Sequence, residues 1–495
     1  MHLSIEEIAS FTGGIILIPS EPGAMATGIT WDSREVNPGD LYVALPGEHV
    51  DGHDFAEEAC RSGAVAVLVS HELDEASMEA LHIASCAVIE VADTALALTD
   101  LAREWRGFLD GVVIGITGSS GKTTTKNLVR DVLSSTMDVV ATRANQNNEL
   151  GVPRTLLTAD EDTDAVVVEM GMRGMGQIQN LAAFVRPDMG LITNVGTCHI
   201  ELLGSQENIA LAKGELFDAL PAGGIAFVNA DDDYMPFLLN ELQLHDRGVR
   251  IVFYDGSGEF RHADELGIWH NADPFVWASD ISYDNHGRPS FTLNARHFAE
   301  MGLPDADTSA SCTMELRGAH NVGNACAAAS VGLAMGMTLD QCCAALAKAQ
   351  PEQGRQMVMT VPSGATVVDD SYNANPDSMR ASLSMFATMD VPGRRIAVLG
   401  NMGELGDYSE EGHRLVGEAA AAAGLDALIC VGKLARTIAE SAQAAGFPRE
   451  AITMVKTAHD AVPVLLEFAP ATGDAVLVKA SHSMELNRVV EGLMA

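Results

Sequence analysis

The sequence predicts an α/β protein of three domains, with a phosphate-binding loop (P-loop) at the start of the central domain. The chain has 495 residues, which is enough for about three domains of ~150 residues each. Short apolar runs alternate with helical patterns through its central and C-terminal parts, as they do in parallel β-α-β units. A glycine-rich loop at 115–125 stands between an apolar run and a helical pattern. These observations favour parallel sheets, with ligands bound at the carboxyl ends of their strands.

Changes of pattern place the domain boundaries near residues 108 and 353. Residues 1–108 mix short strands with helices and are expected to form a smaller N-terminal α/β domain. Residues 109–353 open with the glycine-rich loop and are expected to form the central parallel-sheet domain. Residues 354–495 alternate apolar runs with Ala-rich helices, which indicates a Rossmann-like C-terminal domain. Within the central domain, residues 255–312 are expected to form an irregular or β-hairpin elaboration.

Composition excludes several classes of protein. Hydrophobic residues make up 47% of the chain, so it is not of the disordered class. The 68 acidic residues against 30 Lys and Arg give a formal net charge of −38, which repels nucleic acid and anionic membranes. The N-terminal segment lacks the pattern of a signal peptide, and no apolar run approaches the ~20 residues of a membrane span. The eight cysteines include no CxxC pair, which favours free thiols in a cytoplasmic protein.

The glycine-rich loop Gly115-Ile-Thr-Gly-Ser-Ser-Gly-Lys-Thr-Thr-Thr125 is the most informative motif. Glycines between a strand and a helix let backbone N–H groups surround a phosphate at the helix N-terminus. Lys122 is expected to reach the β- and γ-phosphates, and the Thr123 hydroxyl is expected to bind Mg²⁺. The other expected ATP-binding residues of the loop are Gly118, Ser119, Ser120, Gly121 and Thr124. A Gly/Ser turn before an ordinary helix is the alternative interpretation.

Polar residues follow the last apolar residue of several expected strands. Glu169 follows 165–168, Asp370 comes shortly after Val368, and Lys479 follows Val478. In open parallel sheets, ligands bind beyond the carboxyl ends of the strands. Two such edges that face each other would form a cleft between the central and C-terminal domains.

Further candidates lie in the central domain. Glu169 is placed like the acidic residue that completes a Mg²⁺ shell beside a P-loop, although it can also simply end a strand. His199 lies in a glycine-punctuated loop, and Lys213 lies in a helical pattern. Taken singly, they are as well explained as a structural histidine and a surface lysine. Asn147 and Asn148 lie in an amide-rich turn, where amides can bind phosphates and sugars without adding charge.

Candidates near and beyond residue 320 complete the set. Asn324 lies at the start of an Ala-rich helix and can face a base or ribose, with helix capping as the alternative. Arg355 is placed so that it can reach a γ-phosphate when the cleft closes. Asn373 and Asn375 lie in the polar segment 369–379.

Together these segments resemble the Mur ligase family, ATP-dependent amide-bond-forming enzymes of peptidoglycan synthesis. The segments in family order are the P-loop, Glu169-Met-Gly171, the His199 loop, Lys213-Gly-Glu215, the helix from His320-Asn321 to Asn324, and Gly354-Arg355. Within the family, Asp369-Asp-Ser-Tyr-Asn-Ala-Asn-Pro376 and Gly400-Asn-Met-Gly-Glu-Leu-Gly406 are similar to the member that adds D-alanyl-D-alanine. Asp32-Ser-Arg34, Pro38-Gly-Asp40 and Asp51-Gly-His53 are similar to the UDP-binding domain of the family. The resemblance covers nearly the whole chain.

The resemblance implies a role for each matching position. Lys122 would hold phosphates, Thr123 and Glu169 one Mg²⁺, and His199 a second Mg²⁺. Lys213 matches a lysine that family members carry as a carbamate, which turns a cation into a metal-ligating anion. Asn324 and Asp370 would contact the adenosine, and Arg355 the γ-phosphate. The expected substrate-binding residues are Ser33, Arg34, Asn147, Asn148, Asn373 and Asn375. Two positions depart from the family pattern, because Asn401 stands where Asp is usual and His482 where Arg is usual.

The resemblance implies an ATP-dependent peptide ligase of cell-wall synthesis that acts in cell shape and division. It would join D-alanyl-D-alanine to UDP-N-acetylmuramoyl-tripeptide through an acyl phosphate, as a cytoplasmic monomer with ATP and two Mg²⁺. The third residue of the tripeptide stays open between meso-diaminopimelate and lysine. The alternatives are a sister ligase that adds one amino acid, a folylpolyglutamate-type synthetase, a P-loop kinase or NTPase, and a catalytically silent scaffold. The joint presence of both metal-site patterns argues against the scaffold.

Overall fold

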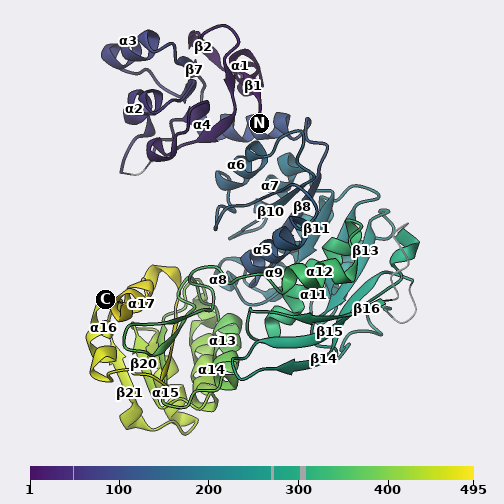
Figure 1. Ribbon diagram of the computed structural model, residues 1–495, viewed down its shortest axis with the longest axis vertical. Helices are drawn as coiled ribbons and strands as arrows, with labels where there is room; N and C mark the ends of the chain where they lie inside the picture. The colour runs from purple at the N-terminus through teal and green to yellow at the C-terminus, as the bar shows by residue number, and fades with distance from the viewer. Residues whose placement is uncertain (48, 269–271, 302–307, 495) are drawn as a thin grey trace.

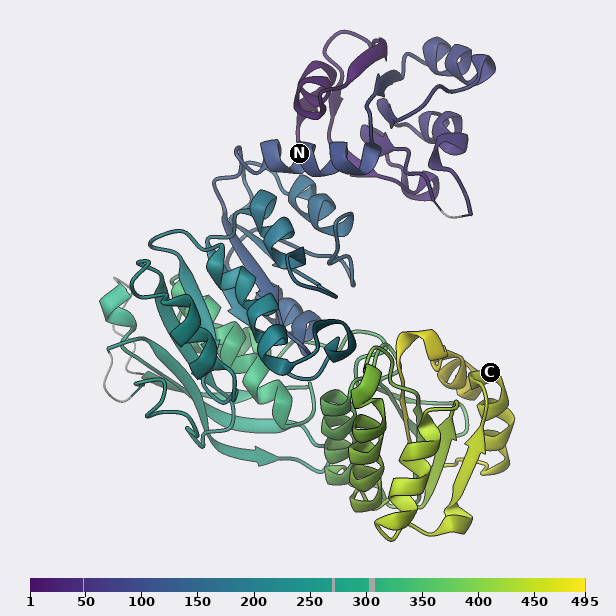
Figure 2. The same cartoon turned by 180° about the vertical axis from the view of Figure 1, so that it is seen from behind.

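The computed structural model describes residues 1–47, 49–268, 272–301 and 308–494. The chain forms three successive lobes in an open arc, with the N-terminal and C-terminal lobes at its two ends (Figures 1 and 2). Each lobe has its own main sheet, and the central sheet is the largest. The expected α/β architecture is confirmed. Among the described residues, no helix combines the length and apolar character that a membrane crossing requires.

The N-terminal lobe contains a five-stranded sheet in the order β2-β7-β6-β5-β4. Its strands are β2 (Ile15–Ile18), β4 (Gly28–Thr30), β5 (Asp40–Val43), β6 (Ala66–Val69) and β7 (Ala87–Glu90), of which only β2 is antiparallel to its neighbour. A separate pair joins β1 (Leu3–Ser4) to β3 (Met25–Ala26). The helices are α1 (Ile5–Thr12), α2 (Ala56–Arg61), α3 (Glu75–Ile83) and α4 (Thr94–Trp105). Trp105 at the end of α4 is buried in a core shared with the central lobe, and its indole N–H donates to the carbonyl oxygen of Ala159 at 3.0 Å.

The central lobe contains a nine-stranded sheet in the order β16-β15-β14-β13-β12-β11-β8-β10-β9. The parallel strands are β8 (Val112–Thr117), β9 (Val139–Ala141), β10 (Ala165–Glu169), β11 (Met189–Ile192), β12 (Ile225–Asn229), β13 (Arg250–Asp255) and β14 (Phe275–Tyr283). Every residue of β10 and β11 is buried, as expected of parallel strands covered by helices on both faces. These helices are α5 (Lys122–Leu133), α6 (Gly151–Thr158), α7 (Gln177–Val185), α8 (Ile200–Leu203), α9 (Gln206–Asp218), α10 (Met235–Leu242), α11 (Ala319–Ala334) and α12 (Leu339–Leu346).

Of the two alternatives for residues 255–312, the β-hairpin is confirmed at the edge of this sheet, whereas residues 269–271 and 302–307 lie outside the described residues. Strand β14 pairs antiparallel with β15 (Pro289–Arg296), which pairs antiparallel with β16 (Thr308–Thr313). Buried and less buried residues alternate along β15, because only one face of the hairpin packs on the core. The hairpin tip reaches the C-terminal lobe, where the backbone N–H of Asp390 donates to the carbonyl oxygen of Asn285 at 2.7 Å. The elaboration therefore supports the C-terminal lobe on one side.

The C-terminal lobe contains a six-stranded sheet in the order β17-β18-β22-β19-β20-β21. The strands are β17 (Met357–Thr360), β18 (Thr366–Asp369), β19 (Arg395–Gly400), β20 (Ala427–Val431), β21 (Ile452–Val455) and β22 (Ala475–Lys479), and only β17 is antiparallel. The helices are α13 (Pro376–Thr388), α14 (Ser409–Ala422), α15 (Ala435–Ala444), α16 (Ala458–Glu467) and α17 (Asn487–Met494). Apolar cores on both faces of the sheet give it the expected Rossmann-like form.

Candidate functional site

A cleft of about 1830 Å³ lies between the carboxyl edges of the central and C-terminal sheets. The P-loop, the loops after β10 and β11 and the start of α11 line it from the central lobe. The loops after β18, β19 and β22 line it from the C-terminal lobe. The strand-end pattern predicted such a cleft, and the structure confirms it.

Most of the predicted site residues meet in this cleft. Those that line it are Ser119, Ser120, Gly121, Lys122, Thr123, Thr124, Asn147, Asn148, Glu169, His199, Asn324, Arg355, Asp370, Asn373 and Asn375. Gly118 and Lys213 are buried beside lining residues, Gly118 next to Thr193 and Lys213 near Lys122. Ser33 and Arg34 lie apart from the cleft, on the N-terminal lobe.

The P-loop connects the end of β8 to the start of α5 and is fastened to the loop after β11. Gly118 has φ +152°, and a Cβ there would lie 1.8 Å from Thr193 Oγ1, so the close approach of the two loops requires glycine. The backbone N–H of Ser120 donates to Asn194 Oδ1 at 3.0 Å, and Thr193 Oγ1 donates to the Ser120 carbonyl oxygen at 2.6 Å. Lys122 Nζ donates to the Gly118 carbonyl oxygen at 2.7 Å, so the lysine lies over its own loop. This cradle has the form that binds phosphate at a helix N-terminus.

Glu169 offers a cation-binding oxygen beside the P-loop. Its carboxylate is buried at the end of β10, and Oε1 accepts a hydrogen bond from Asn147 Nδ2 at 2.7 Å. The other oxygen, Oε2, is buried and has no hydrogen-bond partner within the described parts of the chain. A buried carboxylate oxygen without a partner is costly, and a bound cation removes that cost. With the buried Thr123 hydroxyl in the same cleft, these donors fit a Mg²⁺ ion.

Lys213 lies on α9 with its side chain inside the protein. The residue is 1% exposed, and burial, followed by the positive charge of Lys122, lowers the pKa of Lys213 to about 7. The charges of Cys198 and Asp232 raise the pKa of Lys213 and so oppose part of this shift. The lowered pKa favours the neutral amine near pH 7, and the neutral amine is nucleophilic.

Asp232 is a buried carboxylate whose negative charge raises the pKa of Lys213. It accepts hydrogen bonds from the backbone N–H groups of Val195 at 2.7 Å and Tyr234 at 2.9 Å. Burial raises the pKa of Asp232 to about 6, although these two hydrogen bonds oppose the rise. Asp232 thereby ties the loop after β12 to the loop that carries His199.

His199 lines the cleft and lies immediately before α8. Its Nδ1 atom lies 2.5 Å from Oε2 of Glu404, which comes from the loop after β19 in the C-terminal lobe. Arg173 Nε lies 3.5 Å from Oε1 of the same carboxylate. Burial would raise the pKa of the adjacent Cys198 thiol, but the hydrogen bond with His199 and the charges of Lys122 and Lys213 bring it down to about 7.

The C-terminal wall of the cleft carries two positive side chains. The Arg355 guanidinium lies 4.2 Å from the centre of the Tyr372 ring, a cation–π contact. Lys479 Nζ lies 2.7 Å from Asp370 Oδ2 and donates to the Asn373 carbonyl oxygen at 3.0 Å. On the opposite wall, Asn324 Oδ1 accepts a hydrogen bond from Thr125 at 3.1 Å.

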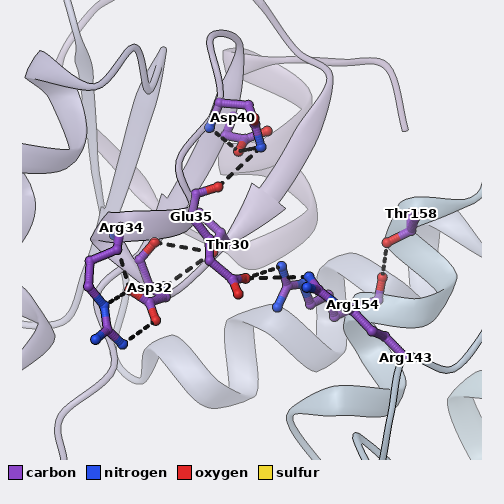
Figure 3. Close-up of polar contacts among 9 residues, drawn as sticks. Thr30, Asp32, Arg34, Glu35, Asp40, Arg143, Arg154 and Thr158 are labelled. Atoms are coloured by element: carbon purple, nitrogen blue, oxygen red, sulfur yellow. Dashed lines mark hydrogen bonds and ion pairs between the residues drawn. The ribbon is translucent and has the colours of Figure 1, made fainter. Parts of the chain in front are cut away.

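Arg34 lies on the N-terminal lobe beside its contact with the central lobe (Figure 3), and Ser33 precedes it in the same turn, Ser33–Glu35. Arg34 is turned back onto Asp32, with Nε 2.8 Å from Oδ1. The next residue, Glu35, reaches across to the central lobe, where its Oε2 accepts a hydrogen bond from Arg154 Nη2 at 3.0 Å. Figure 3 shows Arg143 and Arg154 both directed toward this carboxylate.

A second group of possible metal ligands, Asp51, His53 and His71, lies in the N-terminal lobe. His53 Nε2 accepts a hydrogen bond from the backbone N–H of Ser70 at 2.9 Å, and its Nδ1 lies 2.6 Å from Asp51 Oδ1. Both nitrogens of His53 are thus engaged, and these contacts brace the loop.

Sequence reasoning missed four residues that face the cleft or adjoin its buried groups: Arg173, Asp232, Tyr372 and Glu404. Tyr372 and Glu404 lie in motifs that the sequence had already singled out, whereas Asp232 follows a strand end by three residues. Lys479 was noticed as a strand-end lysine, but only the structure shows its ion pair with Asp370.

Family models match the chain in three successive segments. They are described as the Mur ligase family catalytic domain over residues 26–106, the Mur ligase middle domain over 116–332 and the Mur ligase glutamate ligase domain over 354–482. The chain belongs to the Mur ligase family. The predicted resemblance to the Mur ligases is confirmed, and it extends over all three lobes.

Among the Mur ligases, the chain is similar to relatives and solved structures of one kind of ligase. The UDP-N-acetylmuramoyl-tripeptide–D-alanyl-D-alanine ligase of Mycobacterium tuberculosis is 35% identical, with 100% of this chain and 98% of the relative covered. A crystal structure of MurF from Acinetobacter baumannii superposes with a TM-score of 0.80 at 27% identity, covering 100% of this chain and 99% of that one. MurF ligase from Thermotoga maritima in complex with ADP superposes with a TM-score of 0.73 at 27% identity, covering 95% and 97%.

Proposed function

We propose that this chain joins D-alanyl-D-alanine to UDP-N-acetylmuramoyl-tripeptide with hydrolysis of ATP to ADP and phosphate. The observation that carries the proposal is the cleft, which brings the P-loop, Glu169, His199 and the buried Lys213 opposite Arg355. Full-length similarity to ligases of that name supports the choice of substrates. The chain would act in peptidoglycan synthesis in the cytoplasm, as a monomer, and so in cell shape and division.

Each of the three lobes would bind a different part of the substrates. Residues 1–108 would bind the UDP end of the acceptor through Ser33 and Arg34, residues 109–353 would bind ATP, and residues 354–495 would close over both. The distance of Ser33 and Arg34 from the cleft suits an extended substrate whose UDP end lies far from the reacting carboxylate. Asn147, Asn148, Asn373 and Asn375 would contact the acceptor and the dipeptide near the reacting end.

The P-loop residues 118–124 would hold the phosphates of ATP, and Asn324 and Asp370 would contact its adenosine. Thr123 and Glu169 would hold one Mg²⁺, and His199 with a carbamylated Lys213 would hold a second. Bound Mg²⁺ would neutralise charge on the phosphates during transfer. The unpartnered Glu169 Oε2 supports the first site.

The carbamate on Lys213 would form by attack of the neutral amine on CO₂. The N–C bond forms as one C=O bond of CO₂ opens, a proton leaves the nitrogen, and the product is an anionic carboxylate. The lowered pKa of Lys213 supports this step, because a protonated lysine has no lone pair for attack.

The ligation then follows from the chemistry of a carboxylate, which is a poor electrophile. The γ-phosphoryl group would pass from ATP to the terminal carboxylate of the tripeptide, with Lys122 and Arg355 stabilising the charge in transfer. The amine of D-alanyl-D-alanine would attack the acyl carbon, and phosphate would leave from the tetrahedral intermediate. Docking of the C-terminal lobe would keep water away from the acyl phosphate.

Phosphate release with ATP, Mg²⁺ and UDP-N-acetylmuramoyl-tripeptide tests the proposal. The reaction is run with D-alanyl-D-alanine, with single amino acids or without an acceptor amine, and with either meso-diaminopimelate or lysine in the tripeptide. Release that needs the dipeptide, with a pentapeptide product by mass spectrometry, supports the proposal. Release driven by a single amino acid indicates a sister ligase, and sustained release without an amine indicates an NTPase.

A further inference from the structure

The loop after β19 brings a carboxylate of the C-terminal lobe onto His199. Glu404 Oε2 lies 2.5 Å from His199 Nδ1, an ion-pair contact that lacks the alignment of a hydrogen bond, and Glu404 Oε1 lies 3.5 Å from Arg173 Nε. The His199 side chain is only 17% exposed, whereas the side chains of Glu404 and Arg173 are 41% and 74% exposed. The histidine is therefore the sheltered member of the group, and the side chains of Glu404 and Arg173 are more exposed.

The loop is firmly held at its base. The backbone N–H of Met402 donates to His413 Nε2 at 3.0 Å, and that of Gly403 donates to Ser481 Oγ at 2.8 Å. Asn401 Oδ1 accepts from the backbone N–H of Ala435 at 2.9 Å. Asn401, one of the two departures from the family pattern, thus helps to fix the loop within the C-terminal lobe.

The tip of the loop fits closely against the central lobe. A Cβ at Gly406 would lie 2.8 Å from the Cβ of Glu201 on α8, so the two segments touch at backbone level. Glu404 has φ +59° and His199 has φ +64°, both in the left-handed region that non-glycine residues seldom adopt. Such conformations persist where the surrounding contacts enforce them, and they cluster at functional sites. Two strained residues that face each other across a lobe boundary indicate a specific contact.

We propose that Glu404 is a positioning residue that orients the His199 imidazole through Nδ1 and leaves Nε2 for a divalent cation. This inference rests on the proposed role of His199 as a metal ligand. Metal-ligating histidines commonly give their other ring N–H to a carboxylate, which fixes the tautomer and raises the basicity of the ligand. Glu404 would supply that carboxylate from the other lobe, so a metal site at His199 would be complete only when the C-terminal lobe is docked.

The same position also suits a different task. A carboxylate that lines the cleft can bind the ammonium group of the incoming dipeptide directly. Replacement of Glu404 distinguishes the two roles. Loss of a positioning residue changes the affinity for metal, whereas loss of an ammonium-binding residue changes the KM for the dipeptide.

The test is Mn²⁺ binding to the full-length enzyme with a non-hydrolysable ATP analogue, followed by electron paramagnetic resonance. Glu404→Gln keeps the size of the side chain and removes its charge. The control is Glu410→Gln, at an exposed glutamate on α14 of the same lobe. His199→Ala identifies which of the Mn²⁺ sites depends on the histidine.

We expect Glu404→Gln to weaken the His199-dependent Mn²⁺ site by roughly 10- to 100-fold, with the other site unchanged. The KM for D-alanyl-D-alanine at saturating metal should stay within about twofold of the wild-type value, as should both Mn²⁺ affinities of Glu410→Gln. An unchanged Mn²⁺ affinity in Glu404→Gln overturns the inference, whether or not the KM for the dipeptide rises. The inference is also overturned if His199→Ala retains both Mn²⁺ sites. In that case, ligation of the dipeptide by the wild-type enzyme shows that the proposed function stands although the inference does not.

Discussion

Replacement of Lys213 gives the sharpest test of the proposed chemistry. The side chain lies fully inside the protein on α9, and burial together with Lys122 lowers its pKa to about 7. A lysine at the ordinary value of 10.5 would be neutral in about 1 molecule in 3,000 at pH 7, whereas a pKa of about 7 makes the neutral amine a major form of Lys213. The site therefore raises the population of reactive amine by about three orders of magnitude.

We expect Lys213→Ala to lower kcat by at least about 100-fold, the usual cost of removing one group that stabilises transition-state charge. Formate or acetate should restore part of the lost activity, because a small carboxylate can enter the space left by the side chain. Lys213→Arg should be as inactive as Lys213→Ala, because a guanidinium keeps its proton and cannot react with CO₂. Lys348→Ala, at an exposed lysine on the surface, is the matched control and should keep wild-type turnover.

The assay is phosphate release, combined with ¹³C NMR of the enzyme in ¹³C-bicarbonate. A carbamate resonance should be present in the wild type and in Lys348→Ala and absent from Lys213→Ala. Turnover near the wild-type value in Lys213→Ala would refute the carbamate, and turnover in Lys213→Arg would show that Lys213 acts as a cation instead.

Three further predictions follow from other parts of the structure. Gly118→Ala should abolish binding of an ATP analogue by calorimetry, because its Cβ would lie 1.8 Å from Thr193 Oγ1, whereas Gly174→Ala, in open space, should bind normally. Equal affinities for the two variants would contradict the close-approach argument. Alkylation of Cys198 by iodoacetamide, followed by mass spectrometry, should increase as the pH rises through about 7, because the thiolate is the reactive form. The buried Cys430, whose pKa is raised to about 12 by burial, should stay unlabelled, and equal labelling of both would refute the assignment. A double-mutant cycle of Glu35→Gln and Arg154→Met should give a coupling of about 0.2–1 kcal/mol in urea unfolding, which decreases with salt. A coupling that is insensitive to salt would rule out an ion pair as its source.

The P-loop and the strand-end residues were predictable because they depend on contiguous sequence. A strand, a glycine-rich turn and a helix N-terminus are the parts of a phosphate cradle, so residues 115–125 predicted the local structure correctly and predict a phosphate as its ligand. Likewise, the buried runs of β10 and β11 required parallel neighbours, which carried Glu169 and Thr193 to the same edge of the sheet.

The sequence by itself therefore determined the fold class and the family of this protein, and it predicts the nucleotide site. Only the tertiary structure decided that Lys213 is buried, that Ser33 and Arg34 lie away from the cleft, and that Glu404 meets His199. Local patterns follow from the geometry of a few consecutive residues, but burial and contacts between lobes depend on how distant segments pack. His199 and Glu404 come from separate lobes, and no local period or motif encodes the docking that brings them together.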